Sequence, residues 1–276
     1  MRRDKLAKNV VGIFMGIVSI AWFFPIYFMF INTFKPLKDV VLNTAVFPES
    51  FYFGSYVTIW ENTPYLLMFK NSFIITFFSV LGIVIFGSMA GYKLARANSK
   101  WAYFLIMYFI LTLIIPFQAV MIPLVKIMNN FNLIDSIIGI ILVYIAFGSP
   151  LAIFLYHGAV KAIPKSLEES ATIDGAGPYR TFFKVIFPLL TPITSTVVIL
   201  QTLYIWNDFL LPLITLQSTA NQTLPLGTTA LFFGQYGNKW DLGITAIFMA
   251  SLPMIILYMI MQKYIIKGIV SGATKG

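Results

Sequence analysis

Residues 72–92, SFIITFFSVLGIVIFGSMAGY, form an apolar stretch that contains no charged side chain. A helix needs about 20 apolar residues to cross the hydrocarbon core of a membrane, so this stretch is long enough to span one. Other stretches share its length and character, and together they predict an all-α membrane protein with one transmembrane domain over residues 1–276. The six predicted spans are 11–31, 72–92, 102–124, 137–157, 185–206 and 243–262.

The composition agrees with a membrane protein and excludes several kinds of site. Hydrophobic residues make up 59% of the chain and charged residues 11%, against about 25% charged residues in a typical globular protein. The chain has no cysteine, which excludes disulfides within it, thiolate nucleophiles and cysteine-bound metals. A single histidine, His157, argues against a histidine metal cluster or a catalytic triad. We therefore expect no catalytic residue and no metal site.

The basic residues predict the orientation of the chain in the membrane. Most of the 19 lysine and arginine residues lie in the N-terminal segment, in the second and fourth connections between spans, and in the C-terminal segment. By the positive-inside rule these segments, and so both termini, are cytoplasmic. The net charge of +9 then reflects topology and requires no nucleic-acid partner. Residues 1–8 resemble the start of a signal peptide, but the apolar run at 11–31 is longer than the core of about 7–15 residues in such peptides, so we expect an uncleaved first helix.

The predicted spans contain essentially no ionisable side chain. Carriers driven by protons or sodium ions usually hold such groups inside their spans, where each is costly and therefore functional. The chain also lacks the G-x-x-x-x-G-K-[ST] phosphate loop, so energy for uphill transport would have to come from another subunit. Two G-x-x-x-G pairs, Gly12 with Gly16 and Gly87 with Gly91, are interpreted as ordinary helix packing.

The connection at residues 158–184, GAVKAIPKSLEESATIDGAGPYRTFFK, is the most informative segment. Pro164 ends the preceding helix, and Ser166 is predicted to cap a new helix while Glu169 reaches back to its start. Gly175 suits the left-handed position that follows the end of a helix. The sequence therefore predicts a short helix of about two turns on the cytoplasmic face. This helix could dock a soluble partner or merely connect two spans, and spacing alone leaves both open.

This segment resembles the EAA loop of the membrane-spanning permease subunits of bacterial ABC importers. That loop reads E-A-A, three residues, G, nine residues, I-x-L-P. Here the triplet is ESA at 169–171, the glycine is Gly175 and the closing VIFP lies at 185–188, so the spacing matches throughout. The departures are a serine, a valine and a phenylalanine in place of alanine, isoleucine and leucine. The residues that the resemblance assigns to ATPase coupling are Glu169, Ser170, Ala171, Asp174, Gly175, Ala176 and Pro188.

Further segments are similar to carbohydrate-uptake permeases of the MalG type. FINTFKP at 30–36 resembles their F-x-x-S-F-K pattern, and WNDFLLPL at 206–213 resembles their W-N-x-F-x-x-P-L segment. Residues 262–276 resemble the C-terminal tail of that subunit. The resemblance covers nearly the whole chain and implies the type I, MetI/MalG-like permease fold.

The resemblance also implies partners and a division of labour among them. A second, different permease subunit (MalF-like) would complete the pore, and a cytoplasmic ABC ATPase dimer would hold ATP and Mg²⁺, so no cofactor is expected in this chain. An extracellular or periplasmic solute-binding protein would deliver the sugar, and the chain would be a multi-pass protein of the bacterial plasma membrane. Glu169 would pair with a basic or polar group of the ATPase, Ala171 would be a small contact, and Gly175 would permit the turn after the helix.

The substrate expected from the resemblance is a di- or oligosaccharide. An importer for another solute, such as a sugar alcohol or glycerol phosphate, and an ion-coupled secondary carrier stay open as alternatives. A phosphate ester should favour cationic residues facing the pore, and none is visible in the spans. Several polar and aromatic residues of the spans have the chemistry of sugar ligands, but with 17% aromatic residues such side chains are expected anyway, so no substrate residue is assigned. They are Gln118, Tyr144, Gln201 and Tyr204.

Overall fold

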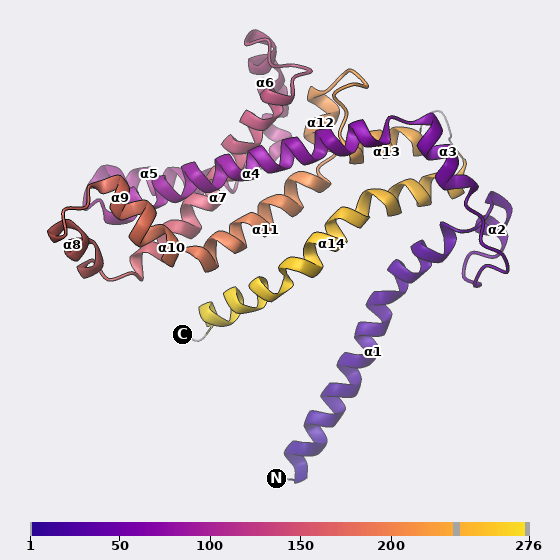
Figure 1. The fold of residues 1–276 in the computed structure, drawn as a ribbon, viewed down its shortest axis with the longest axis horizontal. Coiled ribbons are helices and arrows are strands. Elements are labelled where there is room, and N and C mark those ends of the chain that lie inside the picture. Colours follow the sequence, from indigo (N-terminus) through magenta and orange to yellow (C-terminus); the bar gives the residue numbers. More distant parts are fainter. Residues whose placement is uncertain (1, 234–237, 274–276) are drawn as a thin grey trace. The chain divides into compact units, whose positions relative to one another are not determined.

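The computed structural model describes residues 2–233 and 238–273, and every regular element in these ranges is a helix (Figure 1). The predicted all-α class is therefore confirmed for the described residues. The elements, in chain order, are α1 (Arg2–Asn32), α2 (Leu37–Leu42), α3 (Gly54–Asn62), α4 (Tyr65–Arg96), α5 (Lys100–Thr112), α6 (Phe117–Asn130), α7 (Ile137–Lys161), α8 (Ser166–Ile173), α9 (Pro178–Thr181), the π-helix η1 (Phe182–Ile186), α10 (Phe187–Leu189), α11 (Thr191–Asn207), α12 (Leu210–Thr215), α13 (Leu224–Phe233) and α14 (Trp240–Ala273).

Helices long and apolar enough to cross a membrane recur along the described part of the chain. Four of these candidate spans are uninterrupted helices: Lys8–Asn32, Tyr65–Arg96, Ile137–Lys161 and Trp240–Ile260. Two more candidates are bent pairs: α5 and α6 meet with a bend of 102°, and the segment before α11 meets α11 with a bend of 77°. Counting each bent pair as one span gives up to six, while the orientation of the termini stays a prediction.

Prolines stand at both bends. A proline disfavours the helical conformation of the residue before it and offers no N–H to the helical ladder. Accordingly α5 ends before Pro116 and α6 begins directly after it. Pro188 and Pro192 lie on the two sides of the second break, which falls at Leu190. Each of the predicted spans 102–124 and 185–206 is therefore divided between two helical segments, which hydropathy alone does not show.

The chain, predicted from its sequence as one transmembrane domain, forms two compact units. The first comprises Met1–Tyr65 with Gly227–Pro253, and the second comprises Leu66–Leu226 with Met254–Gly276. Within the first unit the apolar stretch of α1 is exposed along its length. A polar cluster orders the chain after α1: the buried Lys35 ammonium donates to Asn32 Oδ1 (3.1 Å) and to the carbonyl oxygen of Asn43 (2.9 Å).

The second unit holds the larger apolar core, formed by α4, α7, η1 and α11. Its fully buried side chains include Ile83 of α4, Tyr156 of α7 and Ile186 of η1. A Cβ added at Gly91 of α4 would lie only 2.7 Å from the Cβ of Tyr156, so the absence of a side chain there permits close helix packing.

The predicted packing role of the glycine pairs is confirmed for one pair only. A Cβ added at Gly87 would lie 2.6 Å from the Cβ of Ala152, and Gly91 is equally crowded. At Gly12 and Gly16 of α1, an added Cβ would meet no heavy atom within 4 Å. The second pair therefore packs inside its own unit, whereas the first pair has no packing partner within its unit.

Candidate functional site

The short helix predicted after Pro164 is present as α8, in the connection between α7 and α9 (Figure 1). The predicted cap at Ser166 is wrong. Lys165 occupies the N-cap position with helical angles, φ −65° and ψ −25°, and no side chain caps the helix. The backbone already turns at Pro164, whose carbonyl oxygen accepts a hydrogen bond from Leu167 N (3.4 Å). Ser166 is therefore inside the helix, one residue too late for its hydroxyl to act as the cap.

The predicted end of this helix at Gly175 is confirmed. Gly175 has a φ of +77°, the left-handed conformation that favours glycine. Ala176 N donates to the carbonyl oxygen of Ala171 (2.9 Å) and Gly175 N to that of Thr172 (3.0 Å), which satisfies carbonyl groups left over at the helix end. A Cβ added at Gly175 would meet nothing within 4 Å, so the backbone conformation, and not crowding, is what requires glycine here.

The residues assigned to coupling lie on different sides of α8 and of the turn that follows it. Glu169, Ser170, Asp174, Gly175 and Pro188 are exposed, and Ala176 is half-buried. Ala171 is only 8% exposed, so it packs within this chain. Its small side chain lets α8 lie close to its own unit, and its expected contact with the ATPase stays a prediction.

Helix α8 also exposes an apolar side chain, Ile173, near the exposed carboxylate of Glu169. Ile173 is 87% exposed, and it follows Glu169 by four residues, which places both on one helical face. We call Glu169 and Ile173 the docking face. Ile173 lies outside the candidate spans, so its exposed side chain is in contact with water. A partner that covered it would gain about 25 cal/mol of free energy per Å² of apolar surface buried, which favours a binding surface here. The docking face thus combines a carboxylate with an apolar contact.

The opposite side of α8 is fastened to the end of α4. Arg96 Nε lies 2.6 Å from Glu168 Oε1, and the two side chains are 14% and 19% exposed. The Tyr92 hydroxyl donates to Glu168 Oε2 (2.8 Å), and Arg96 Nη2 donates to the carbonyl oxygen of Ile163 in the turn before α8 (2.8 Å). Charge-assisted bonds of this kind are about twice as strong as neutral ones. We call Tyr92, Arg96 and Glu168 the α4–α8 clamp.

Sequence reasoning missed this clamp. Glu168 stands next to Glu169, but only Glu169 belongs to the E-A-A triplet, so the motif assigns no role to Glu168. Arg96 is counted among the residues of the positive-inside rule. The two are 72 residues apart, and no local pattern reports a pairing over that separation.

At the other end of the second unit, one carboxylate holds two loops together. Asp135 Oδ1 accepts hydrogen bonds from Gln217 N and Ser218 N (both 3.0 Å), and the carbonyl oxygen of Asp135 accepts one from Asn221 Nδ2 (2.6 Å). Burial acts to raise the pKa of Asp135, but the hydrogen bonds from Ser218, Asn221 and Gln217 outweigh it and lower the pKa below the usual range. These hydrogen bonds therefore hold the loop after α12 in place. The loop belongs to the connection between the predicted spans 185–206 and 243–262, which is expected to lie outside the membrane.

Two of the side chains with sugar-binding chemistry, Tyr144 and Gln201, form hydrogen bonds within the second unit. Tyr144 is buried, and its hydroxyl donates to Asp208 Oδ2 (3.0 Å). The other oxygen of this carboxylate, Oδ1, accepts a hydrogen bond from Leu210 N at the start of α12 (2.9 Å). Gln201 is buried and donates to the carbonyl oxygen of Gly148 (3.4 Å). These contacts serve the fold of the second unit, so they assign no substrate residue.

Residues 83–271, more than half of the chain, match the family described as "Binding-protein-dependent transport system inner membrane component". The chain belongs to this family. The match includes α8, the docking face and the whole α4–α8 clamp. The description names a system that depends on a binding protein, which a secondary carrier acting through this chain alone would not need.

Members of the family resemble the chain over its full length. It is 40% identical over 276 residues to the probable starch degradation products transport system permease protein AmyC of Thermoanaerobacterium thermosulfurigenes, covering 100% of both chains. It is 37% identical over 271 residues to the melibiose/raffinose/stachyose import permease protein MelC of Bacillus subtilis, covering 98% of both.

A solved structure supports the permease fold predicted from the motifs. The chain matches one chain in the crystal structure of a bacterial ABC transporter involved in the import of the acidic polysaccharide alginate, with a TM-score of 0.82 over 96% of this chain and 98% of that one. Sequence identity is 23%, so this likeness shows the fold. The all-helical ABC importer permease fold is thereby confirmed.

Proposed function

We propose that this permease forms one half of the translocation pore of an ABC importer for a di- or oligosaccharide. The observation that carries the proposal is α8, which presents Glu169 and the 87% exposed Ile173 on one side while Glu168 fastens the other side to α4. The sugar class is supported by relatives named for starch degradation products and for melibiose, raffinose and stachyose.

The proposed assembly contains this chain, a second and different permease of the MalF type, a cytoplasmic ABC ATPase dimer, and a solute-binding protein outside the membrane. ATP and Mg²⁺ would be held by the ATPase, and this chain would carry no cofactor of its own. The expected location is the bacterial plasma membrane.

In the proposed mechanism α8 transmits the movement of the ATPase. Closure of the ATPase dimer on ATP displaces the docking face, where Glu169 meets a basic or polar group and Ile173 enters an apolar recess. The clamp from Glu168 to Arg96 passes that displacement to α4. The turn at Gly175 joins α8 to α9, and η1 and α10 lead from there into α11, so a second route reaches the bundle.

The proposal is tested by sugar uptake in cells that lack the chromosomal copy of this gene. Wild-type protein should restore uptake of labelled raffinose or a maltooligosaccharide, whereas a chain with both Glu169→Lys and Ile173→Ser should be inserted but inactive. Lys93→Gln, which removes an exposed charge from the end of α4, is the matched control and should restore uptake. Undiminished sugar uptake in cells without the chain, or full uptake by the double variant, would contradict the proposal.

A further inference from the structure

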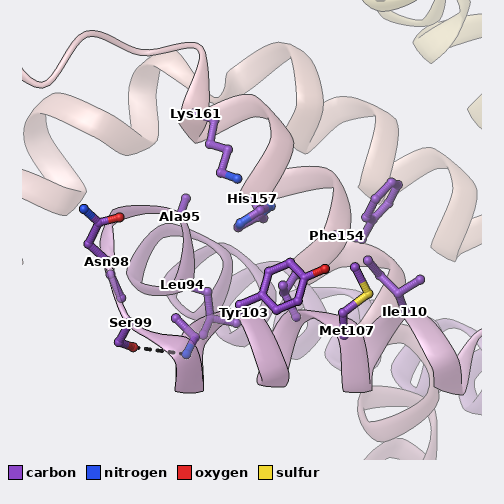
Figure 2. A pocket seen from close by; sticks show the side chains of 13 residues that line it. Leu94, Ala95, Asn98, Ser99, Tyr103, Met107, Ile110, Phe154, His157 and Lys161 are labelled. Atoms are coloured by element: carbon purple, nitrogen blue, oxygen red, sulfur yellow. Dashed lines mark hydrogen bonds between the residues drawn. The ribbon is translucent and has the colours of Figure 1, made fainter.

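The second unit contains a cavity that the proposed coupling mechanism does not use. It has a volume of about 380 Å³ and lies between the C-terminal end of α4, the length of α5 from Ala102 to Ile110, and the C-terminal part of α7 (Figure 2). This is the end of α7 that the sequence predicts to face the cytoplasm. The cavity has a polar end and an apolar end, which are formed by different side chains.

The Lys161 ammonium gives the polar end a positive charge that no carboxylate lining the cavity balances. His157 and Lys161 stand one turn apart on α7, and the Lys161 side chain points into the cavity toward His157 (Figure 2). Asn98 lines the cavity from the loop between α4 and α5. Within the described part of the chain, none of these side chains forms a hydrogen bond or salt bridge, and no aspartate or glutamate lines the cavity. The polar end is therefore complementary to an anion.

The apolar end lies at the level of the predicted spans. Met107 and Ile110 of α5 and Phe154 of α7 line it, with Met107 39% and Phe154 45% exposed (Figure 2). All three residues belong to the stretches predicted to cross the membrane, 102–124 and 137–157. A free phosphate or nucleotide would not use such a wall, whereas a hydrocarbon chain would.

We infer that this cavity binds one anionic glycerophospholipid, with its phosphate at Lys161 and His157 and one acyl chain along Met107, Ile110 and Phe154. Basic pockets between membrane helices on the cytoplasmic side suit anionic headgroups. A zwitterionic headgroup would bring an ammonium group for which the cavity offers no carboxylate. The inference rests on the membrane location of the chain, and not on the sugar or on ATPase docking.

The test is thermal unfolding of the full-length permease, purified in an uncharged detergent. Phosphatidylglycerol added to the micelles should raise the Tm, and phosphatidylcholine with the same acyl chains should not. Lys161→Gln should raise the half-saturating phosphatidylglycerol fraction about fivefold, as expected for the loss of one basic residue near an anionic lipid. Lys93→Gln removes an exposed charge from α4 outside the cavity and should leave the response unchanged.

Two further arms separate a lipid from a simple anion. Inorganic phosphate and glycerol 3-phosphate should not reproduce the shift at matched concentrations, because neither reaches the apolar end. Met107→Trp should weaken the phosphatidylglycerol response by filling that end, and the Tm of each variant without lipid reports an intact fold.

Equal shifts with the two phospholipids, an unchanged response of Lys161→Gln, or a full shift with inorganic phosphate alone would overturn the lipid site. Transport plays no part in this assay, so such a result would leave the proposed function standing. Conversely, a failed uptake experiment would leave the lipid site to be decided by the Tm measurements.

Discussion

Arg96 and Glu168 are 72 residues apart in the chain, yet Arg96 Nε lies 2.6 Å from Glu168 Oε1. The first residue ends α4 and the second lies in the first turn of α8. This pair connects the segment proposed to contact the ATPase with a long helix of the permease core. The carbonyl oxygen of Ile163 and the hydroxyl of Tyr92 complete the same network, so a displacement of α8 acts on α4 directly.

Breaking this pair should uncouple ATP hydrolysis from transport. Because the pair is half-buried and hydrogen-bonded, Arg96→Gln and Glu168→Gln should each lower sugar uptake per ATP hydrolysed severalfold in proteoliposomes. In a double-mutant cycle the coupling energy should be about 1.5–3 kcal/mol, the range for hydrogen bonds to charged groups. Lys93→Gln, three residues before Arg96, should retain the wild-type ratio. Additive effects of the two substitutions would show that the pair does not act as a unit.

The left-handed turn at Gly175 should be needed for ATPase recovery. Gly175→Ala and Gly175→Asp force a side chain into a φ of +77°, at a cost of about 1–2 kcal/mol, although no neighbour crowds the site. We expect less ATPase to co-purify with either variant while membrane insertion stays normal. Gly177→Ala is a matched control, because Gly177 has a φ of −70° and equally open surroundings. Equal ATPase recovery from Gly175→Ala and Gly177→Ala would contradict the role of the turn.

The loop held by Asp135 should loosen in acid. The pKa of Asp135 is lowered in the folded protein, so its contribution to stability is fully present above the unfolded pKa of about 4 and is lost as the pH falls through the lower folded value. Amide exchange over residues 216–224 should therefore be unchanged between pH 5 and 7 once corrected for intrinsic rates, and should rise below about pH 4. Asp135→Asn should show the faster exchange already at pH 7. A rise centred near pH 6 would point to another group.

Local signals in the sequence predict much of this molecule correctly. Apolar runs such as 72–92 predict membrane helices, because spanning the hydrocarbon core requires length and apolarity and little else. Gly175 is predictable because a left-handed helix end favours glycine whatever surrounds it. The spacing from Glu169 through Gly175 to Pro188 identifies the family, since it describes one continuous segment.

The remaining features depend on choices between local alternatives or on contacts between distant segments. Ser166 fits a capping pattern, but Pro164 starts the helical turn earlier, so the hydroxyl is left inside the helix. Pro116 breaks its span whereas Pro150 is accommodated within α7, and the residue type alone does not distinguish the two outcomes. The pairing of Arg96 with Glu168 arises only once α4, α7 and α8 are folded together.

The central claim, that α8 docks an ATPase through the face of Glu169 and Ile173, can be tested by cross-linking. The chain has no cysteine, so Ile173→Cys introduces one thiol into it. A membrane fraction that expresses the whole importer would be treated with a thiol-to-amine reagent of short span, and the adducts of the tagged chain would be identified by mass spectrometry. We predict an adduct with the ATPase subunit for Ile173→Cys and none for Lys93→Cys. The absence of an ATPase adduct at Ile173, in membranes where the importer takes up sugar, would contradict the account.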